Sequence, residues 1–146
     1  MAGQHEGGPL PSPFDASMGA TLEAVAADRV VAVLPVTPHL HQPAGIVHGG
    51  VYCSLVELAA SVGANTWLDD GRVAVGVSNH TDFLRAVRSG TLRAEAAPLQ
   101  RGRTLQLWAV EVTDERDRLV AHGRVRLANI DASASPTDAG AAGQSP

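Results

Sequence analysis

The chain has 146 residues, of which 45% are hydrophobic, 18% are charged and 3% are aromatic, and its formal net charge at pH 7 is -4. This length fits one globular domain with one core, because two domains would each be too small to bury much apolar surface. The acidic balance and the few aromatic side chains disfavour a nucleic-acid-binding protein, which needs a basic surface or stacking platforms.

The single cysteine, Cys53, excludes an intrachain disulfide and any metal site built from several cysteines. The histidines at 39, 41, 80 and 122 lack the spacing of metal ligands, so we expect no metal and no cofactor. The N-terminus has no basic segment followed by an apolar one, and no apolar run has the quality of a membrane span. We therefore expect a soluble cytoplasmic protein without nucleic-acid or membrane partners.

The first half of the chain predicts two helices and a strand. Residues 1–13 and 131–146 are rich in Gly, Pro, Ala and Ser, so we expect flexible tails around a domain at 14–130. A short helix is expected at 15–26 and a strand at 29–36. The apolar run at 49–68 is too long for a strand, which predicts a helix that ends at the Asp-Asp-Gly turn.

The second half predicts four strands rich in valine and leucine, at 72–85, 91–100, 104–113 and 119–130. The predicted order is therefore one strand, one long buried helix and four antiparallel strands. In so small a domain, the sheet can cover an apolar helix by curling around it. We expect this α+β arrangement, the hotdog fold.

The polar residues of the long helix recur at spacings of three and four and so share one stripe: Ser54, Glu57, Ser61 and Asn65. Glu57 is the only carboxylate between residues 46 and 68, where there is also no Arg or Lys. Two interpretations stay open: an ordinary solvent-facing stripe, or a stripe that lines a cleft on a helix covered elsewhere. In the second, Glu57 suits a general base or a nucleophile.

The entrance of the helix, His48-Gly49-Gly50, offers complementary chemistry. Free backbone N–H groups and the positive end of the helix dipole point outward there, and glycine lets an oxygen approach the backbone. Such a place can hold a carbonyl oxygen that becomes an oxyanion, although a Gly-Gly pair can also be a plain helix entry. Gly49 and Glu57 are about 12 Å apart along one helix, so a shared site needs two antiparallel copies.

These residues form a pattern that resembles the hotdog-fold acyl-CoA thioesterases: Gln42-x-x-Gly45-x-x-His48-Gly49-Gly50, then Glu57 and Ser61. The nearest group resembles the phenylacetate-pathway and aryl-CoA (4-hydroxybenzoyl-CoA and 1,4-dihydroxy-2-naphthoyl-CoA) thioesterases. The resemblance covers about residues 28–130 and includes the motif GVSNHTDFLR at 76–85, followed by Gly90, Pro98 and GRT at 102–104.

The resemblance implies a catalytic set composed of Glu57, Gly49, Gly50, His48, Gln42 and Ser61. Glu57 would be the nucleophile or general base, and the amide of Gly49 or Gly50 from the neighbouring subunit would polarise the thioester carbonyl. Gln42 and His48 would orient that carbonyl and the attacking water. Ser61 would position the water or the carboxylate.

The resemblance also implies two substrate-binding regions. The acyl and pantetheine channel would be lined by Gly76, Phe83, Leu84, Arg85 and Ala86. The nucleotide end of CoA would lie against Gln100, Arg101, Gly102, Arg103, Thr104 and Leu105. The two arginines also suit phosphates as guanidinium forks in a turn, with ordinary solvated charge as an equal alternative.

The expected function is hydrolysis of an aryl- or medium-chain acyl-CoA to the free acid and CoA, by a homo-oligomer that is a dimer of dimers. Two alternatives stay open: a hotdog hydratase or dehydratase, whose usual Asp/His pair is not evident, and a hotdog module that binds acyl-CoA without catalysis. Cys53, Trp67 and Trp108 are expected to be packing residues.

Overall fold

The computed structural model describes residues 11–134. Its first half consists of α1 (Pro13–Met18), β1 (Thr21–Ala26), β2 (Arg29–Pro35), a 3-10 turn (Pro38–Leu40) and the long helix α2 (Gly49–Trp67). Its second half consists of β3 (Arg72–Phe83), β4 (Thr91–Arg101), β5 (Leu105–Thr113), β6 (Leu119–Asp131) and a 3-10 turn (Ala132–Ala134).

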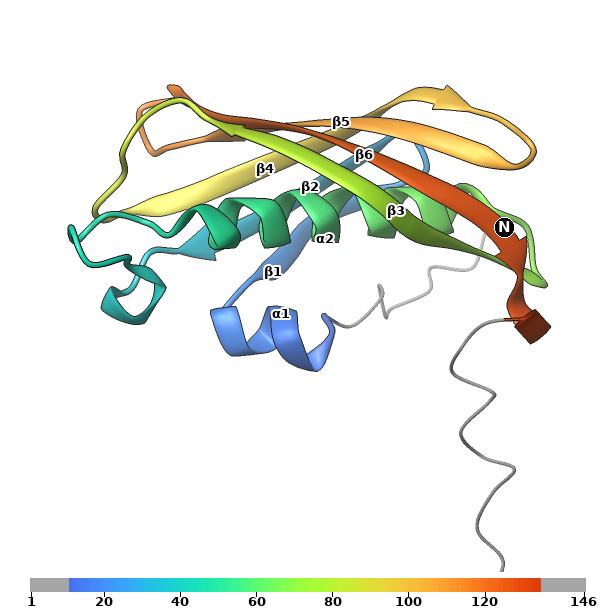
Figure 1. Cartoon of the computed structure of the whole chain (residues 1–146), viewed down its shortest axis with the longest axis horizontal. Coiled ribbons are helices and arrows are strands. Elements are labelled where there is room, and N and C mark those ends of the chain that lie inside the picture. The colour runs from blue at the N-terminus through green and yellow to red at the C-terminus, as the bar shows by residue number, and fades with distance from the viewer. Residues whose placement is uncertain (1–10, 135–146) are drawn as a thin grey trace, which may run out of the picture.

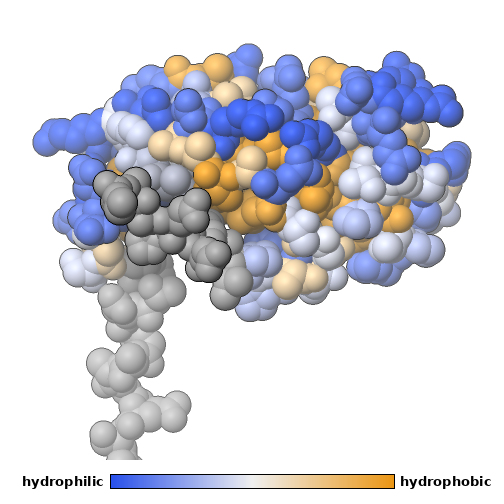
Figure 2. Space-filling model, turned by 180° about the vertical axis from the view of Figure 1, so that it is seen from behind, coloured by the Kyte–Doolittle hydropathy of each residue, from blue (hydrophilic) through white to orange (hydrophobic). Residues whose placement is uncertain are grey.

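The strands form one antiparallel sheet in the order β1-β2-β4-β5-β6-β3. The sheet curls around α2, with β3 and β1 at its two edges and α1 on the other side of the helix (Figure 1). This arrangement confirms the expected hotdog fold. From the opposite side, Figure 2 shows hydrophobic side chains grouped near the middle of the surface and bordered by hydrophilic ones.

The core lies between α2 and the concave face of the sheet. Leu55, Val56 and Ala59 of the helix are fully buried there, as is Trp108 of β5. Trp108 is therefore a packing residue, as expected, and its indole N–H donates to a buried glutamine. Gly63 lets the helix lie close to this ring, because a β-carbon at this position would come within 2.6 Å of it.

The helix expected at 15–26 is wrong beyond Met18. Ser12 caps α1 in a capping box with Asp15, and Gly19 ends the helix in the left-handed conformation, with φ of 91°. After Ala20, the residues at 21–26 form β1, which pairs with β2. Within the described residues, two strands rather than one therefore precede α2. A short, mostly apolar segment of six residues is compatible with a helix or a strand, and its pairing with a neighbouring strand decides between them.

The tails expected at 1–13 and 131–146 lie largely outside the described residues. Within the described part, Ser12 and Pro13 belong to the start of α1, and Asp131 ends β6. The remaining predicted elements agree with the structure, apart from shifts of one or two residues at their ends.

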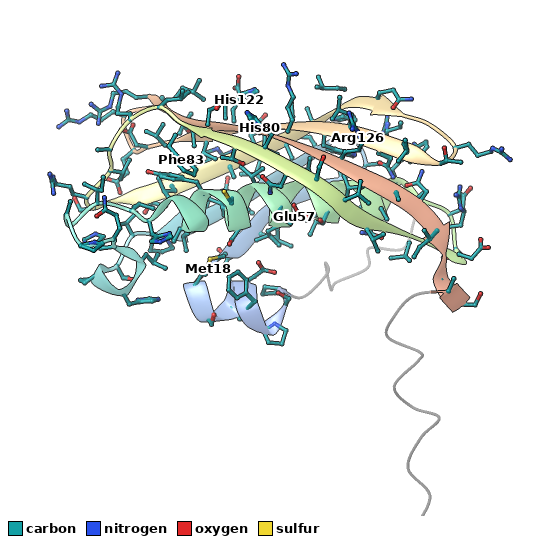
Figure 3. The ribbon with its side chains drawn as sticks, in the orientation of Figure 1. Met18, Glu57, His80, Phe83, His122 and Arg126 are labelled. Atoms are coloured by element: carbon teal, nitrogen blue, oxygen red, sulfur yellow. The ribbon has the colours of Figure 1, made fainter. Side chains whose placement is uncertain are left out.

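A β-bulge in β3 determines which side chains of that strand face the helix. The register against β6 slips between Gly76 and Ser78. Beyond the slip, Asn79 and Thr81 pair with Val125 and Gly123, which are buried on the concave side. Ser78, His80 and Asp82 pair with residues of the convex side, and Figure 3 shows His80 on the side away from α2. The bulge therefore turns the odd-numbered positions toward Glu57.

Candidate active site

Glu57 lies half-buried at the middle of α2, and its carboxylate is held from β3 (Figure 3). The Asn79 side-chain amide donates to Oε2 at 2.9 Å, and the Ser61 hydroxyl makes a long contact of 3.5 Å with Oε1. Gly76 lies directly against Oε1, where the β-carbon of any other residue would overlap with the oxygen. The carboxylate is thus fixed by one hydrogen bond and by the backbone of β3.

Glu57 opens on a cleft of about 810 Å³ between α2 and α1. All four polar residues of the helix stripe line this cleft: Ser54, Glu57, Ser61 and Asn65. Apolar walls are contributed by Leu58 and Val62 of α2 and by Phe14 of α1. The interpretation of the stripe as a cleft lining is therefore confirmed, and that of an ordinary solvent face is wrong.

Cys53 also lines this cleft and is only half-buried, so its expected place in the core is wrong. A small apolar residue on a helix is equally compatible with a core position and with a cleft wall. Cys53 would be a core residue if a strand covered that side of α2, and it is a cleft residue because α1 lies there instead.

Four of the five residues expected around the acyl channel, those at 83–86, line a second pocket of about 320 Å³ at the N-terminal end of α2, whereas the fifth, Gly76, lies against Glu57. Its lining includes Gln42, Gly49, Tyr52 and residues 83–86. The Phe83 ring lies so close to Gly49 that a β-carbon there would overlap with it, and its centroid is 5.7 Å from that of Tyr52. Burial, with a smaller contribution from a nearby aspartate, raises the pKa of Tyr52 to about 12, so this phenol stays protonated at neutral pH.

The helix entrance offers two backbone amides, but only one is available. His48 is the N-cap of α2, and its Nδ1 accepts from the Gly50 N–H at 2.8 Å. The ring proton of neutral His48 therefore resides on Nε2. The Gly49 N–H has no partner among the described residues, as is typical of the first turn of a helix. Of the two expected oxyanion donors, Gly49 is thus the available one.

A single chain keeps Gly49 and Glu57 in two different pockets. Their separation of eight residues corresponds to about 12 Å along α2, whereas a reacting carbonyl must be about 3 Å from both groups. Each chain thus presents the carboxylate with Ser61 in one place, and Gln42 with the helix entrance in another.

Residues 100–105, expected at the nucleotide end of CoA, comprise the end of β4, the turn at 102–104 and the start of β5, and they lie outside both pockets. Arg101 is engaged within its own chain: its guanidinium donates to the Ala27 carbonyl at 2.8 Å and lies 5.2 Å above the Trp67 ring. Arg103 is exposed. Arg85 lines the pocket beside Gly49 and is also exposed.

Asn79 is not among the site residues expected from the sequence, although it is part of the motif at 76–85. Strict alternation from buried Ala74 would turn Ser78 toward the helix and Asn79 away from it. The bulge reverses this assignment. Gly76 carries the one signal in the sequence, because glycine within a strand often marks a bulge or a close approach.

Within residues 11–134, no group of three His, Cys, Asp or Glu side chains is arranged to hold a metal ion. None of the helices described has both the length and the apolar character needed to cross a membrane.

The chain belongs to the Thioesterase superfamily, whose family model matches residues 44–121. A 1,4-dihydroxy-2-naphthoyl-CoA hydrolase of Listeria monocytogenes is 31% identical over 112 residues, which cover 77% of this chain and 91% of that protein. The structure of Rv1847/MT1895 from Mycobacterium tuberculosis is 47% identical, with a TM-score of 0.80, over 82% of this chain and 98% of that one. The thioesterase HI1161 from Haemophilus influenzae is 32% identical, with a TM-score of 0.78, over 81% and 82% of the two chains. The protein is a thioester hydrolase, as expected.

The contact between Gly76 and Glu57 gives a first testable prediction. In Gly76→Ala, the new methyl group takes the place of Oε1, so the carboxylate must rotate away and kcat should fall at least about tenfold. Thiol release at saturating substrate measures this loss. The matched control is Val77→Ala at the next, 56% exposed position, which should retain wild-type kcat. Equal losses in both variants would contradict the proposed fit.

Proposed function

We propose that the protein is an acyl-CoA thioesterase that hydrolyses an aryl- or medium-chain acyl-CoA to the free acid and CoA, with Glu57 as the nucleophile or general base. One observation carries this proposal. The only carboxylate of α2 is held between Asn79 and Gly76 at the wall of a cleft large enough for an acyl group. Among the described residues Glu57 has no ion-pair partner, and a charge kept on a half-buried helix surface in this way costs stability, which favours a catalytic role.

The acyl group is proposed to lie in the cleft between α2 and α1. Leu58, Val62 and Phe14 provide apolar walls, and an aromatic side chain there suits an aryl group as well as an alkyl chain. The thioester carbonyl would then lie beside Glu57. The carboxylate either attacks the carbonyl carbon, or removes a proton from a water that attacks it. Both routes end in a free acid and the CoA thiol.

The second half of the site is proposed to come from the neighbouring subunit. Its Gly49 N–H would donate to the carbonyl oxygen as negative charge develops there, supported by the positive end of the α2 dipole. The separation of Gly49 from Glu57 within one chain supports this arrangement. The hydrophobic group on the surface in Figure 2 supports a homo-oligomer, a dimer or a dimer of dimers, because such patches mark subunit contacts.

Gln42 and His48 are proposed to orient the substrate from that second subunit. The Gln42 Oε1 accepts from the Ala44 N–H at 2.5 Å, so its side-chain NH₂ group remains for a carbonyl oxygen. The His48 Nδ1 is engaged by Gly50, so Nε2–H remains as a donor. Both side chains therefore present donors, which suits an oxygen that gains negative charge.

Arg85, beside the pocket at the helix entrance, and Arg101, at the end of β4, give a second prediction. Arg85→Ala should raise KM about fivefold and leave kcat nearly unchanged, because an exposed phosphate contact contributes to binding alone. Arg101→Ala should instead lower the melting temperature, since this side chain holds Ala27 and Trp67. The wild-type KM should rise with salt, and Arg85→Ala should lose part of that rise. A fall in kcat without a change in KM for Arg85→Ala would place the phosphates elsewhere.

A thiol-release assay over a panel of aryl-, medium-chain and short-chain acyl-CoA esters tests the proposal. The panel includes 1,4-dihydroxy-2-naphthoyl-CoA, because the relative from Listeria monocytogenes is named as the hydrolase of this ester. We expect kcat/KM to be highest for an aryl or medium-chain ester. Binding of these esters without thiol release would contradict the proposal and favour an acyl-CoA-binding module.

A further inference from the structure

We propose that Asn79 and Thr81 form a positioning chain for Glu57, in which Thr81 anchors the Asn79 side-chain oxygen and Asn79 fixes the carboxylate for catalysis. The proposal rests on the proposed role of Glu57 as nucleophile or base. It adds to that role two residues of β3 that do not touch the reacting atoms.

The hydrogen bonds of Asn79 connect β3 to α2 at Glu57. Its side-chain nitrogen donates one proton to the Glu57 Oε2 at 2.9 Å and the other to the Cys53 carbonyl at 3.0 Å. Its side-chain oxygen accepts from the Thr81 hydroxyl at 2.7 Å. All of the amide donors are used, and each faces an acceptor.

The Glu57 and Cys53 oxygens fix the orientation of that amide, and Thr81 holds its oxygen end. If the Asn79 amide were flipped, its oxygen would face two other oxygens, those of Glu57 and Cys53, and its NH₂ group would face a hydroxyl. The Thr81 donor supports the catalytic orientation, in which the NH₂ group points to Glu57. Thr81 is itself part-buried on the concave side because of the bulge.

This arrangement makes the two oxygens of Glu57 unequal. Oε2 is engaged by Asn79. Among the described residues, Oε1 has only the long hydrogen-bonding contact with Ser61, and the backbone of Gly76 packs against one side of it. Oε1 is thus the oxygen without a short hydrogen bond, and the proposal assigns it to the thioester carbon or the attacking water.

Few other titratable groups face Glu57. Along the cleft, α1 contributes Asp15, and α2 contributes Cys53 beside Glu57 itself. From β3, His80 and Asp82 lie on the opposite face of the sheet. His48 of the neighbouring subunit, which the proposed function places at the same carbonyl, is a further titratable group. The readout is therefore the displacement of the acid limb in Asn79→Asp relative to the wild type, since both proteins retain His48.

The test compares substitutions at both positions by kcat, KM and pH profile. Asn79→Ala should lower kcat about 10- to 100-fold with KM within about twofold, as expected for a lost hydrogen bond to a charged group. In Asn79→Asp, a second carboxylate faces Glu57 and favours its protonated form, so the acid limb of kcat against pH should move upward by about one unit or more. Glu57 must be ionised to act, so activity at a given low pH falls.

Thr81 provides a matched pair that keeps the inference testable if the Asn79 variants fail to fold. Thr81→Val retains the shape but removes the hydroxyl, and kcat should fall about 3- to 10-fold. Thr81→Ser retains the hydroxyl and should remain within about twofold of wild type. Ser78→Ala, on the convex face of the same strand, controls for general effects on β3 and should retain full activity.

A purely structural role would give a different result. Thermal melts would then show losses of stability that parallel the losses of kcat, with an unmoved acid limb in Asn79→Asp and equal effects of the two Thr81 variants. Any of these results overturns the inference. If Glu57→Gln abolishes activity while the acid limb and kcat of the Asn79 variants stay unchanged, the positioning chain fails alone. If Glu57→Gln remains active, the proposed function fails instead.

Discussion

Glu57→Gln is expected to lower kcat at least about 100-fold while the protein stays folded. The substitution preserves the shape of the side chain but removes the charge that attacks the carbonyl or accepts a proton, and such a group contributes about 10²- to 10⁴-fold. Thiol release under saturating acyl-CoA measures kcat. KM or the affinity for a non-hydrolysable acyl-CoA analogue should change little, because the acyl group is proposed to lie against the apolar walls of the cleft.

The matched control is Glu111→Gln, the same chemical change at an exposed strand position, which should be fully active. The Glu57 variant should also melt at or above the wild-type temperature, since a half-buried carboxylate is removed. Turnover above about a tenth of the wild-type value would refute the assignment of Glu57.

Mixing two inactive variants is expected to restore activity. Glu57→Ala retains the helix entrance, and the double variant His48→Ala/Gly49→Val retains the carboxylate. If each site combines Glu57 of one chain with Gly49 of the next, a hybrid dimer contains one intact site. Random exchange at equal amounts should therefore yield about a quarter of the wild-type activity. Co-refolding of the mixture, followed by the thiol-release assay, measures this gain.

Each variant refolded alone at the same total concentration is the control, and its activity should stay at the background of the Glu57→Gln protein. Sedimentation at the assay concentration should show a dimer or a tetramer. A mixture no more active than the sum of its parts, or a fully active monomer, would contradict the two-chain site.

Much of the fold follows from the sequence because the strongest patterns belong to the largest elements. The apolar run at 49–68 predicts α2, and four valine- and leucine-rich segments predict β3 to β6. The β1 segment was not predicted, because it is stabilised by pairing with β2 and by contact with α2, which a local pattern cannot reveal. Gly19 could have indicated the end of α1, because a glycine often ends a helix in the left-handed conformation.

The candidate site was predictable in part. A lone carboxylate on an apolar helix pointed to Glu57, and the structure places it with Ser61 in the cleft. The availability of Gly49 over Gly50 could not be predicted, because it depends on the side-chain rotamer of His48. The stacking of Arg101 on Trp67 could not be predicted either, because the two residues are far apart in the sequence.

The irregularity of β3 between Gly76 and Ser78 makes the length of this strand as important as its composition. The strand carries two interleaved sets of side chains: Asn79 and Thr81 for the helix, and Ser78, His80 and Asp82 for the outer surface. Losing Val77, the extra residue at the slip, would leave Ser78 opposite Arg126 and Asn79 opposite Val125, and so would keep both sets in place. One residue inserted after Ser78 would instead exchange the sets and bring an imidazole and a carboxylate toward Glu57.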